Sequence, residues 1–462
     1  MLRIIYIPLL LVLLWSFWRV LGKFGRCDTA LTPILGWTVG LAFFFLAPLS
    51  LMVIHGGYQD PAFYAASASH NTVDLSSTQF FVPFLVIWTS LLLSAGVLLL
   101  FLPKAPPQAE PARDRLELVS HPALLKKVIF VTTVLALLDY ALTIRMVGGF
   151  EEFLLSNWSG RVSDLSAELG DRYALYLWIA QANQIVFTAA AVLYTHFEAQ
   201  EGKIHWRISG LLVLVFLLHI AFQGERIYLA LYLLSALTSC WLYRRKKVVA
   251  GLLLAAPVLA VVFSAWAYFR NDLSNLGDNV SVYNDADMQN RTMTWFMDAC
   301  DGDDVMFLFH VIQDFGTGHE YLYGMSYARA AYFMIPRSMF PEKPHGFNLQ
   351  LAEIYEPGSP TSFAATQLGE LYANFGPASI LLLPALTLAI LLLSNHLRKG
   401  AQHHPLIFTE MFLLLIWSAR STLEDQFITF VFAFLLTCGL RLERGWGRRS
   451  RVALPSLPII SL

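Results

Sequence analysis

Long apolar runs recur along most of the chain and alternate with short polar segments. Many runs reach about 17–25 residues, the length that a helix needs to cross about 30 Å of hydrocarbon. The pattern predicts an all-α, polytopic membrane protein with about 11 transmembrane helices in one integral membrane domain, residues 1–462. The predicted spans are 2–18, 31–54, 80–103, 125–147, 173–195, 208–222, 227–243, 248–269, 377–395, 406–419 and 426–440.

Composition and charge refine this picture. The chain is 56% hydrophobic and 14% charged, whereas about a quarter of the residues in soluble domains are charged. Lys and Arg collect in every second loop, as in Lys23, Lys104, Arg244 and Arg398. Because cytoplasmic loops are the basic ones, the N-terminus is expected outside and the C-terminus inside. The first run lacks a signal-peptide cleavage pattern, so we interpret it as a retained span.

The largest outer loop is expected to cover residues 270–376 and to carry short helices. An aromatic, amphipathic stretch runs from Tyr321 to Met334. A second helix is expected after Thr361 or Ser362 as N-cap, with a stop or kink at Gly376-Pro377. Between them, "YARAAYFMIPRSMFPEKPHGFN" (327–348) contains three prolines, which disfavour helix and predict a stiff, irregular, cationic segment.

Several Lys and Arg residues lie in the predicted outer segments, although basic residues otherwise collect in the cytoplasmic loops. All but one of these outer cations are arginine. Arginine can bind phosphate through two parallel hydrogen bonds and keeps its charge. A single such residue is equally explained by snorkelling or an ion pair, as between Arg420 and Glu424. Several together favour an anionic ligand. The outer cations are Arg145, Arg161, Arg172, Arg226, Arg270, Arg291, Arg329, Arg337, Lys343 and Arg420.

The expected helix before Gly376 also carries a candidate catalytic group. Gln367, Glu370 and Asn374 are three and four residues apart and therefore share one face. A carboxylate between two amides near the membrane surface is a candidate general base, although a solvated polar face explains the spacing equally well. His345 is a second candidate for catalysis. The acidic pairs of "YNDAD" (283–287) and "CDGDD" (300–304) are typical of solvated loops, so no metal is expected.

At these residues the chain resembles the oligosaccharide repeat-unit polymerases, the Wzy-type O-antigen polymerases of bacterial inner membranes. Four stretches carry the resemblance, and "ARSTLED" (419–425) matches more loosely. The stretches at 335–344 and 366–376 are the more specific ones. The four stretches are "VGGFEEFLLSNWSGR" (147–161), "GER" (224–226), "IPRSMFPEKP" (335–344) and "TQLGELYANFG" (366–376).

The resemblance implies a glycosyltransferase-C-like fold in the inner membrane with its active site facing the periplasm. It implies polymerisation of glycan repeat units carried on undecaprenyl pyrophosphate, which serve as donor and acceptor. A flippase and a chain-length regulator are the implied partners, besides membrane lipid, with no cofactor and no nucleic acid. In this hypothesis Glu370 or His345 is the base, and the cradle for the pyrophosphate consists of Arg161, Arg226, Arg270, Arg337, Lys343 and Arg420.

Two other functions fit the same pattern. A glycan ligase would use the same lipid-linked donor and a similar arginine cradle. A lipid-oligosaccharide flippase or other transporter would need ionisable groups near the bilayer midplane, and only Asp139 lies in such a place in the predicted spans.

Overall fold

The structure is a computed structural model that describes residues 3–24, 32–59, 72–102, 302–332, 346–355, 363–400 and 405–422. It also describes short pieces between 130 and 145 and the positions 149, 194–195, 234, 297, 339–340 and 342. Of the predicted spans, those beginning at 173, 208, 227, 248 and 426 lie outside these residues except for isolated positions. The span 125–147 is described only in pieces.

The described chain is mostly helical, and four helical stretches are long and apolar enough to cross a membrane: Ile4–Phe24, Pro33–His55, Thr78–Phe101 and Thr366–Asn395. They overlap the predicted spans that begin at 2, 31, 80 and 377. The helices are α1 (Arg3–Phe24), α2 (Thr32–Leu41), the π-helix η2 (Ala42–Leu46), α3 (Ala47–His55), α4 (Phe81–Phe101) and α17 (Ser379–Gly400). The span predicted at 406–419 appears as α18 (Pro405–Ser418). With 14 residues it is about 21 Å long, short of the hydrocarbon thickness.

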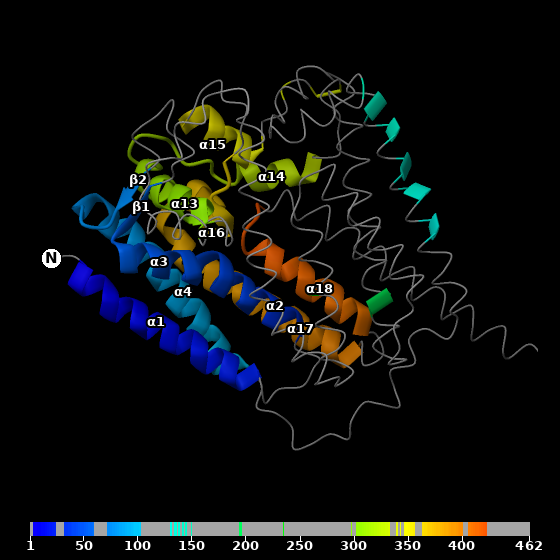
Figure 1. Cartoon of the computed structure of the whole chain (residues 1–462), viewed down its shortest axis with the longest axis horizontal. Coiled ribbons are helices and arrows are strands. Elements are labelled where there is room, and N and C mark those ends of the chain that lie inside the picture. The colour runs from blue at the N-terminus through cyan, green and yellow to red at the C-terminus, as the bar shows by residue number, and fades with distance from the viewer. Residues whose placement is uncertain are drawn as a thin grey trace, which may run out of the picture.

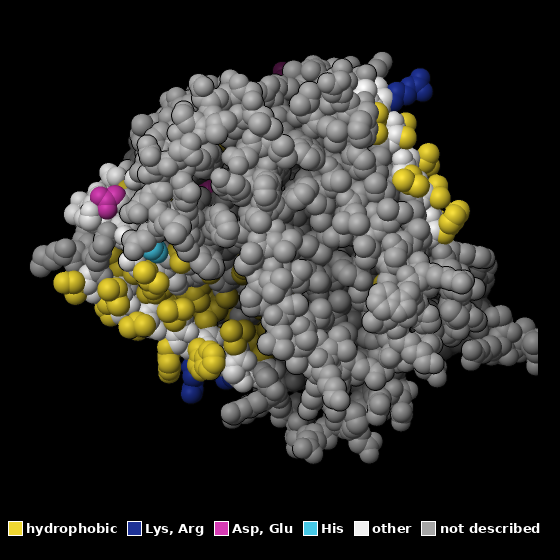
Figure 2. All heavy atoms as spheres, in the orientation of Figure 1, with side chains coloured by type: hydrophobic (Ala, Val, Ile, Leu, Met, Phe, Trp, Pro, Cys, Tyr) yellow, Lys and Arg dark blue, Asp and Glu magenta, His cyan; other side chains and the backbone are white. Residues whose placement is uncertain are grey.

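The outward face of α1 is apolar and exposed, as expected of a helix in contact with lipid. Ile4 and Trp18 are each 75% exposed, although both are large and apolar. Hydrophobic side chains cover this side of the molecule, with basic side chains below them (Figure 2). A soluble protein rarely exposes so large an apolar surface, whereas hydrocarbon solvates it. The chain is therefore embedded in a membrane.

The inner face of α1 packs along α4, and the two helices run parallel. Near their starts, the rings of Tyr6 and Phe84 lie 4.4 Å apart between centroids. Trp88 Nε1 donates to the Leu9 carbonyl over 2.7 Å, and towards the other end Lys23 Nζ donates to the Leu99 carbonyl. These contacts place the starts of both helices at the same end of the bundle.

Two glycines bring α2 and α18 into close contact. A Cβ at Gly36 would lie 2.3 Å from the Phe412 carbonyl oxygen, and one at Gly40 would lie 2.5 Å from that of Ile416. The spacing is that of the small-xxx-small motif, which lets membrane helices approach closely. On another side of α2, Trp37 Nε1 donates to Thr387 Oγ1 of α17 over 3.0 Å. Together these contacts fix α2, α17 and α18 as one unit.

The π-helix η2 interrupts the second span for a local reason. Pro48 cannot donate the hydrogen bond that an α-helix would make to the Phe44 carbonyl, and its ring would clash with that group. The chain instead widens by one residue, and the Ala47 N–H bonds the Ala42 carbonyl. The widened turn places Phe44 edge-on to Trp417 of α18, with centroids 5.8 Å apart.

A cap of short elements covers one end of this bundle, at the end of α3 and the start of α4 (Figure 1). The antiparallel pair β1 (Gly57–Gln59) and β2 (Thr72–Asp74) joins those helices through the 3₁₀ turn η4 (Thr78–Phe80). The cap also contains α13 (Gly302–Asp314), α14 (Met325–Tyr332), α15 (Phe347–Tyr355) and α16 (Thr366–Phe375). Buried α13 packs on α16, α4 and α3, which ties the cap to the bundle.

Both helices expected in this region are present. The amphipathic stretch contains α14, and α16 ends at Gly376, where the 3₁₀ turn η7 (Gly376–Ala378) leads into α17. The predicted N-cap was wrong. Helix α16 begins at Thr366 with Ala365 as N-cap and no side-chain cap, because the Gln367 N–H bonds the carbonyl of Ala419, the residue that follows α18. The helix α13 was not expected.

Candidate functional site

The polar face of α16 is buried and faces α14. Gln367, Glu370 and Asn374 are 2%, 0% and 1% exposed, so the solvated alternative is wrong for this face. A buried carboxylate is costly unless hydrogen bonds satisfy its oxygens. The arrangement therefore requires partners from the neighbouring helix.

Helix α14 supplies those partners through Ser326 and Tyr327. Ser326 Oγ donates to Glu370 Oε1 over 2.7 Å and accepts from Asn374 Nδ2 over 2.8 Å. The same Asn374 amide donates to the Glu370 carbonyl over 2.7 Å. Gln367 Nε2 donates to the Tyr327 hydroxyl oxygen over 3.3 Å. The Glu370 carboxylate thus bonds Ser326, which also bonds Asn374, while Gln367 and Tyr327 form a second hydrogen-bonded pair between the same two helices.

The phenol of Tyr327 is held in its neutral form. Burial, and next the negative charge of Glu370, raise the pKa of Tyr327 above its ordinary value, while the hydrogen bond from Gln367 lowers it by less. Tyr327 also stacks on Phe375, with centroids 5.8 Å apart and planes 17° apart. Its ring is therefore fixed beside the carboxylate.

Asn374 also fixes the turn that enters α14. Its Oδ1 accepts from the Gly324 N–H over 3.0 Å, and the Ala373 carbonyl accepts from the Leu322 N–H over 2.8 Å. Because these contacts come from the same helix as Glu370, the turn, Ser326 and the carboxylate form one rigid unit.

The start of α16 meets the end of α18. The Gln367 N–H bonds the carbonyl of Ala419 over 3.3 Å, and the residue after Ala419 is Arg420. Thr366 adopts a positive φ of 62°, a strained backbone for a β-branched residue. Of the predicted cradle residues, Arg420 is the one that the described part of the chain contains. This junction places it next to the helix that carries Glu370.

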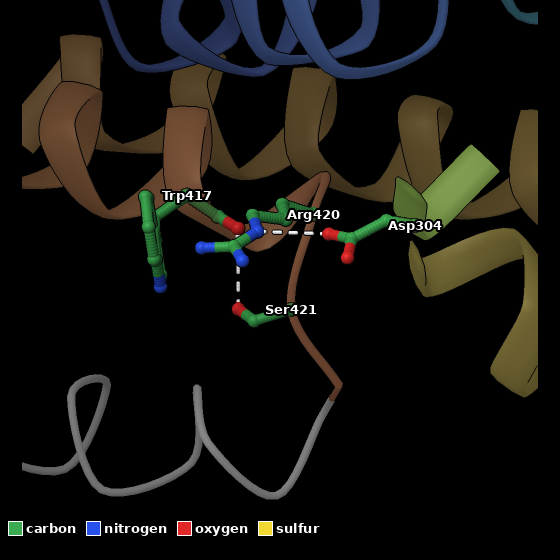
Figure 3. A network of polar contacts seen from close by, with 4 residues as sticks. All are labelled: Asp304, Trp417, Arg420 and Ser421. Atoms are coloured by element: carbon green, nitrogen blue, oxygen red, sulfur yellow. Dashed lines mark hydrogen bonds and ion pairs between the residues drawn. The ribbon is translucent and has the colours of Figure 1, made fainter. Parts of the chain in front are cut away.

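The guanidinium of Arg420 lies between a carboxylate and an indole (Figure 3). Its Nε donates to Asp304 Oδ2 over 2.8 Å, and its central carbon lies 4.8 Å from the Trp417 ring centroid. Asp304 stands in the first turn of α13, where the helix dipole favours a negative charge. The described acidic partner is thus Asp304, whereas Glu424, the partner considered from sequence, lies outside the described residues.

The described residues contain two of the predicted site residues, Glu370 and Arg420, both at the capped end. The others lie outside the described part of the chain. Within the described residues no group of three His, Cys, Asp or Glu side chains could hold a metal. The predicted site residues that remain undescribed are His345, Arg161, Arg226, Arg270, Arg337 and Lys343.

Sequence reasoning missed Ser326, Tyr327, Asp304 and Trp417. A serine and a tyrosine next to each other in an amphipathic stretch carry no signal of their own, because they gain meaning only from the helix packed against them. Asp304 belongs to an acidic pair that we interpreted as a solvated loop, and in the structure it is 6% exposed. That interpretation was wrong for Asp304 because α13 is buried between α16 and the bundle.

Comparison of the chain with protein-family models, curated proteins and solved structures gives no match. The site therefore has to be interpreted from its own chemistry. A buried carboxylate with ordered hydroxyl and amide partners can accept a proton from a bound hydroxyl. A neighbouring guanidinium can stabilise negative charge on a leaving group.

Proposed function

We propose that this protein is a membrane glycosyltransferase that polymerises glycan repeat units carried on undecaprenyl pyrophosphate, as the sequence resemblance implies. In this proposal the chain has about 11 spans in a glycosyltransferase-C-like arrangement in the bacterial inner membrane. The N-terminus lies outside, the C-terminus inside, and the capped end faces the periplasm. The product is an O-antigen or a related surface polysaccharide.

The buried carboxylate of Glu370 is the observation that best supports this proposal. An apolar membrane protein has little structural need for a carboxylate that is 0% exposed, and an apolar side chain of similar size would cost less to bury. Ser326 and Asn374 hold the carboxylate in a network at the end of the bundle rather than within it. A site at this depth suits a substrate whose lipid is in the bilayer and whose glycan is in water.

The proposed reaction needs no nucleotide. The Glu370 carboxylate takes the proton from a hydroxyl of the acceptor glycan, and the hydroxyl oxygen forms a bond to the anomeric carbon of the donor. The bond from that carbon to the pyrophosphate oxygen breaks, and the lipid pyrophosphate leaves with the electron pair. Arg420 and the predicted cradle arginines stabilise the negative charge that develops on it.

A glycan ligase remains the second candidate function, because it would use the same donor and base. A flippase would need ionisable groups near the bilayer midplane, whereas the buried carboxylate described above lies at the end of the bundle. Asp139, the midplane candidate, lies outside the described residues. The acceptor separates polymerase from ligase. Purified protein supplied only with lipid-linked repeat units should yield longer glycans without a nucleotide sugar or an ion gradient.

The decisive variant is Glu370→Gln, which keeps the volume and an oxygen that accepts from Ser326 but removes the basic carboxylate. We expect polymerisation to fall by about 10²- to 10⁴-fold, the range for a lost general base. The control is Glu320→Gln, the same change at an exposed position of the cap. If Glu370→Gln polymerises like the parent and melts at the same temperature, Glu370 is a structural residue and the proposed base is wrong.

A further inference from the structure

The turn that enters α14 has an unusual sequence for its conformation. Met325 N–H bonds the Leu322 carbonyl over 2.9 Å, and the two residues between them, Tyr323 and Gly324, have φ angles of 47° and 86°. Two successive positive φ angles are those of a type I′ turn, in which Asn-Gly and Asp-Gly are strongly preferred. Here the first position holds a tyrosine, whose Cβ makes the left-handed region unfavourable.

This turn also exposes apolar side chains where water-facing turns carry polar ones. Tyr323 is 78% exposed and Met325 is 50% exposed. The sequence from Leu322 to Met325 contains no charged residue. A strained, exposed and uncharged turn is poorly suited to water, because turns of this type normally gain from polar residues that solvate the backbone. Its surroundings should therefore be partly apolar.

The turn lies at the level where α17 enters the apolar bundle. Phe375 is the last residue of α16, before the Gly376-Pro377 break, and it is 42% exposed. Its ring lies 3.8 Å from the point that a Cβ on Gly324 would occupy. Leu381, in the first turn of α17, is 68% exposed and so faces lipid. Tyr323 and Met325 thus continue the lipid-facing surface of α17 beyond its end.

We propose that Tyr323, Met325 and Phe375 form a membrane-interface anchor that dips into the boundary between lipid headgroups and acyl chains. Aromatic rings with a polar tip are enriched at this depth in membrane proteins, where the ring contacts acyl chains and the hydroxyl reaches water. The methionine and phenylalanine favour lipid over a sugar ring, which offers hydroxyl groups to be bonded. This anchor is independent of the proposed reaction, since it follows from exposure and position alone.

The anchor has a consequence for the carboxylate beside it. Because Asn374 bonds both the turn and Ser326, the depth at which Tyr323 rests fixes the depth of Glu370. The polar network is then held at the headgroup level rather than above the membrane.

Spin labels measure this depth directly. We would replace the four native cysteines, attach a nitroxide at position 323 of the full chain in phospholipid nanodiscs, and measure its collisions with oxygen and with a water-soluble nickel chelate. Labels at Leu381 and at exposed Glu320 provide the lipid and water references. A label at Met325 gives the same measurement if labelling at 323 impairs folding.

We expect access to nickel at 323 to be several-fold lower than at 320 and higher than at 381, with oxygen access above that at 320. Equal access to nickel at 323 and 320 would overturn the anchor. A label at 323 that is open to nickel until lipid-linked glycan is added would also overturn it, in favour of a sugar-binding surface. Nanodiscs without added glycan should therefore already show the protection.

Discussion

Replacing Gly36 by alanine is expected to separate α2 from α18 and to destabilise the protein. The added Cβ would lie 2.3 Å from the Phe412 carbonyl oxygen and 2.9 Å from the Phe412 Cα and carbonyl carbon. All three are backbone atoms, so no side-chain rotation relieves the contact. An unstrained carbon–oxygen contact needs about 3.3 Å, and α18 would have to move by about 1 Å.

The magnitude follows from this required movement. Overpacking inside a well-packed interior typically costs about 1–3 kcal/mol, and a clash with backbone belongs at the upper end of that range. Moving α18 would also disturb the Gln367–Ala419 hydrogen bond, which joins the residue after α18 to α16. We therefore expect Gly36→Ala to lower the free energy of unfolding by about 2–3 kcal/mol.

Gly96→Ala is the matched control. This glycine also lies inside an apolar helix, α4, but nothing lies within 4 Å of the place where its Cβ would be. Alanine favours a helix over glycine by about 0.5–1 kcal/mol, so this variant should be unchanged or slightly more stable. Unfolding in mixed micelles, followed by circular dichroism, measures both. If Gly36→Ala unfolds like Gly96→Ala, α2 and α18 do not pack as closely as described.

Three further predictions concern the site. Arg337→Lys should lose nearly as much polymerisation as Arg337→Ala, roughly 10- to 100-fold, if two parallel hydrogen bonds to phosphate are needed; parental activity in the lysine variant at limiting substrate would limit the residue to a structural role. Asp304→Asn should lower the free energy of unfolding by about 1–3 kcal/mol, because Arg420 Nε loses a charged partner; unchanged micelle unfolding would contradict the pair. Since the folded-state pKa of Tyr327 lies above its ordinary value of 10.0, the unfolded chain releases this proton first, and stability falls as pH rises above about 10. Tyr327→Phe should show a smaller fall between about pH 9 and 11, and an identical pH profile would refute the shift.

The spans that the structure describes were predictable from sequence because length and hydropathy alone define them. The end of α16 was equally predictable, since a glycine followed directly by a proline favours the end of a helix. The shared face of Gln367, Glu370 and Asn374 followed from helical spacing. In each case the signal is local to the segment.

The remaining features depend on contacts between distant segments, which no local pattern contains. The burial of Glu370 depends on Ser326, 44 residues earlier, and Arg420 pairs with Asp304 across 116 residues. Helix α13 has a polar first turn that resembles a loop in sequence, and only its packing against α16 explains the burial of Asp304. The start of α16 was misplaced because a backbone bond from Gln367 to Ala419, the residue after α18, replaces the expected side-chain cap.

The π-helix η2 lets a single apolar run serve two sets of neighbours. Helix α2 packs on α18 and α17, whereas α3, its direct continuation, packs on α1 and β1. An extra residue in one turn shifts the angular phase of everything after it by about 100°, the rotation per residue of an α-helix. Deleting one residue from 42–46 would remove this offset, and α2 and α3 could then no longer both face their partners. The second span is thus two half-helices of different phase, and its length in residues is fixed by that offset as well as by membrane thickness.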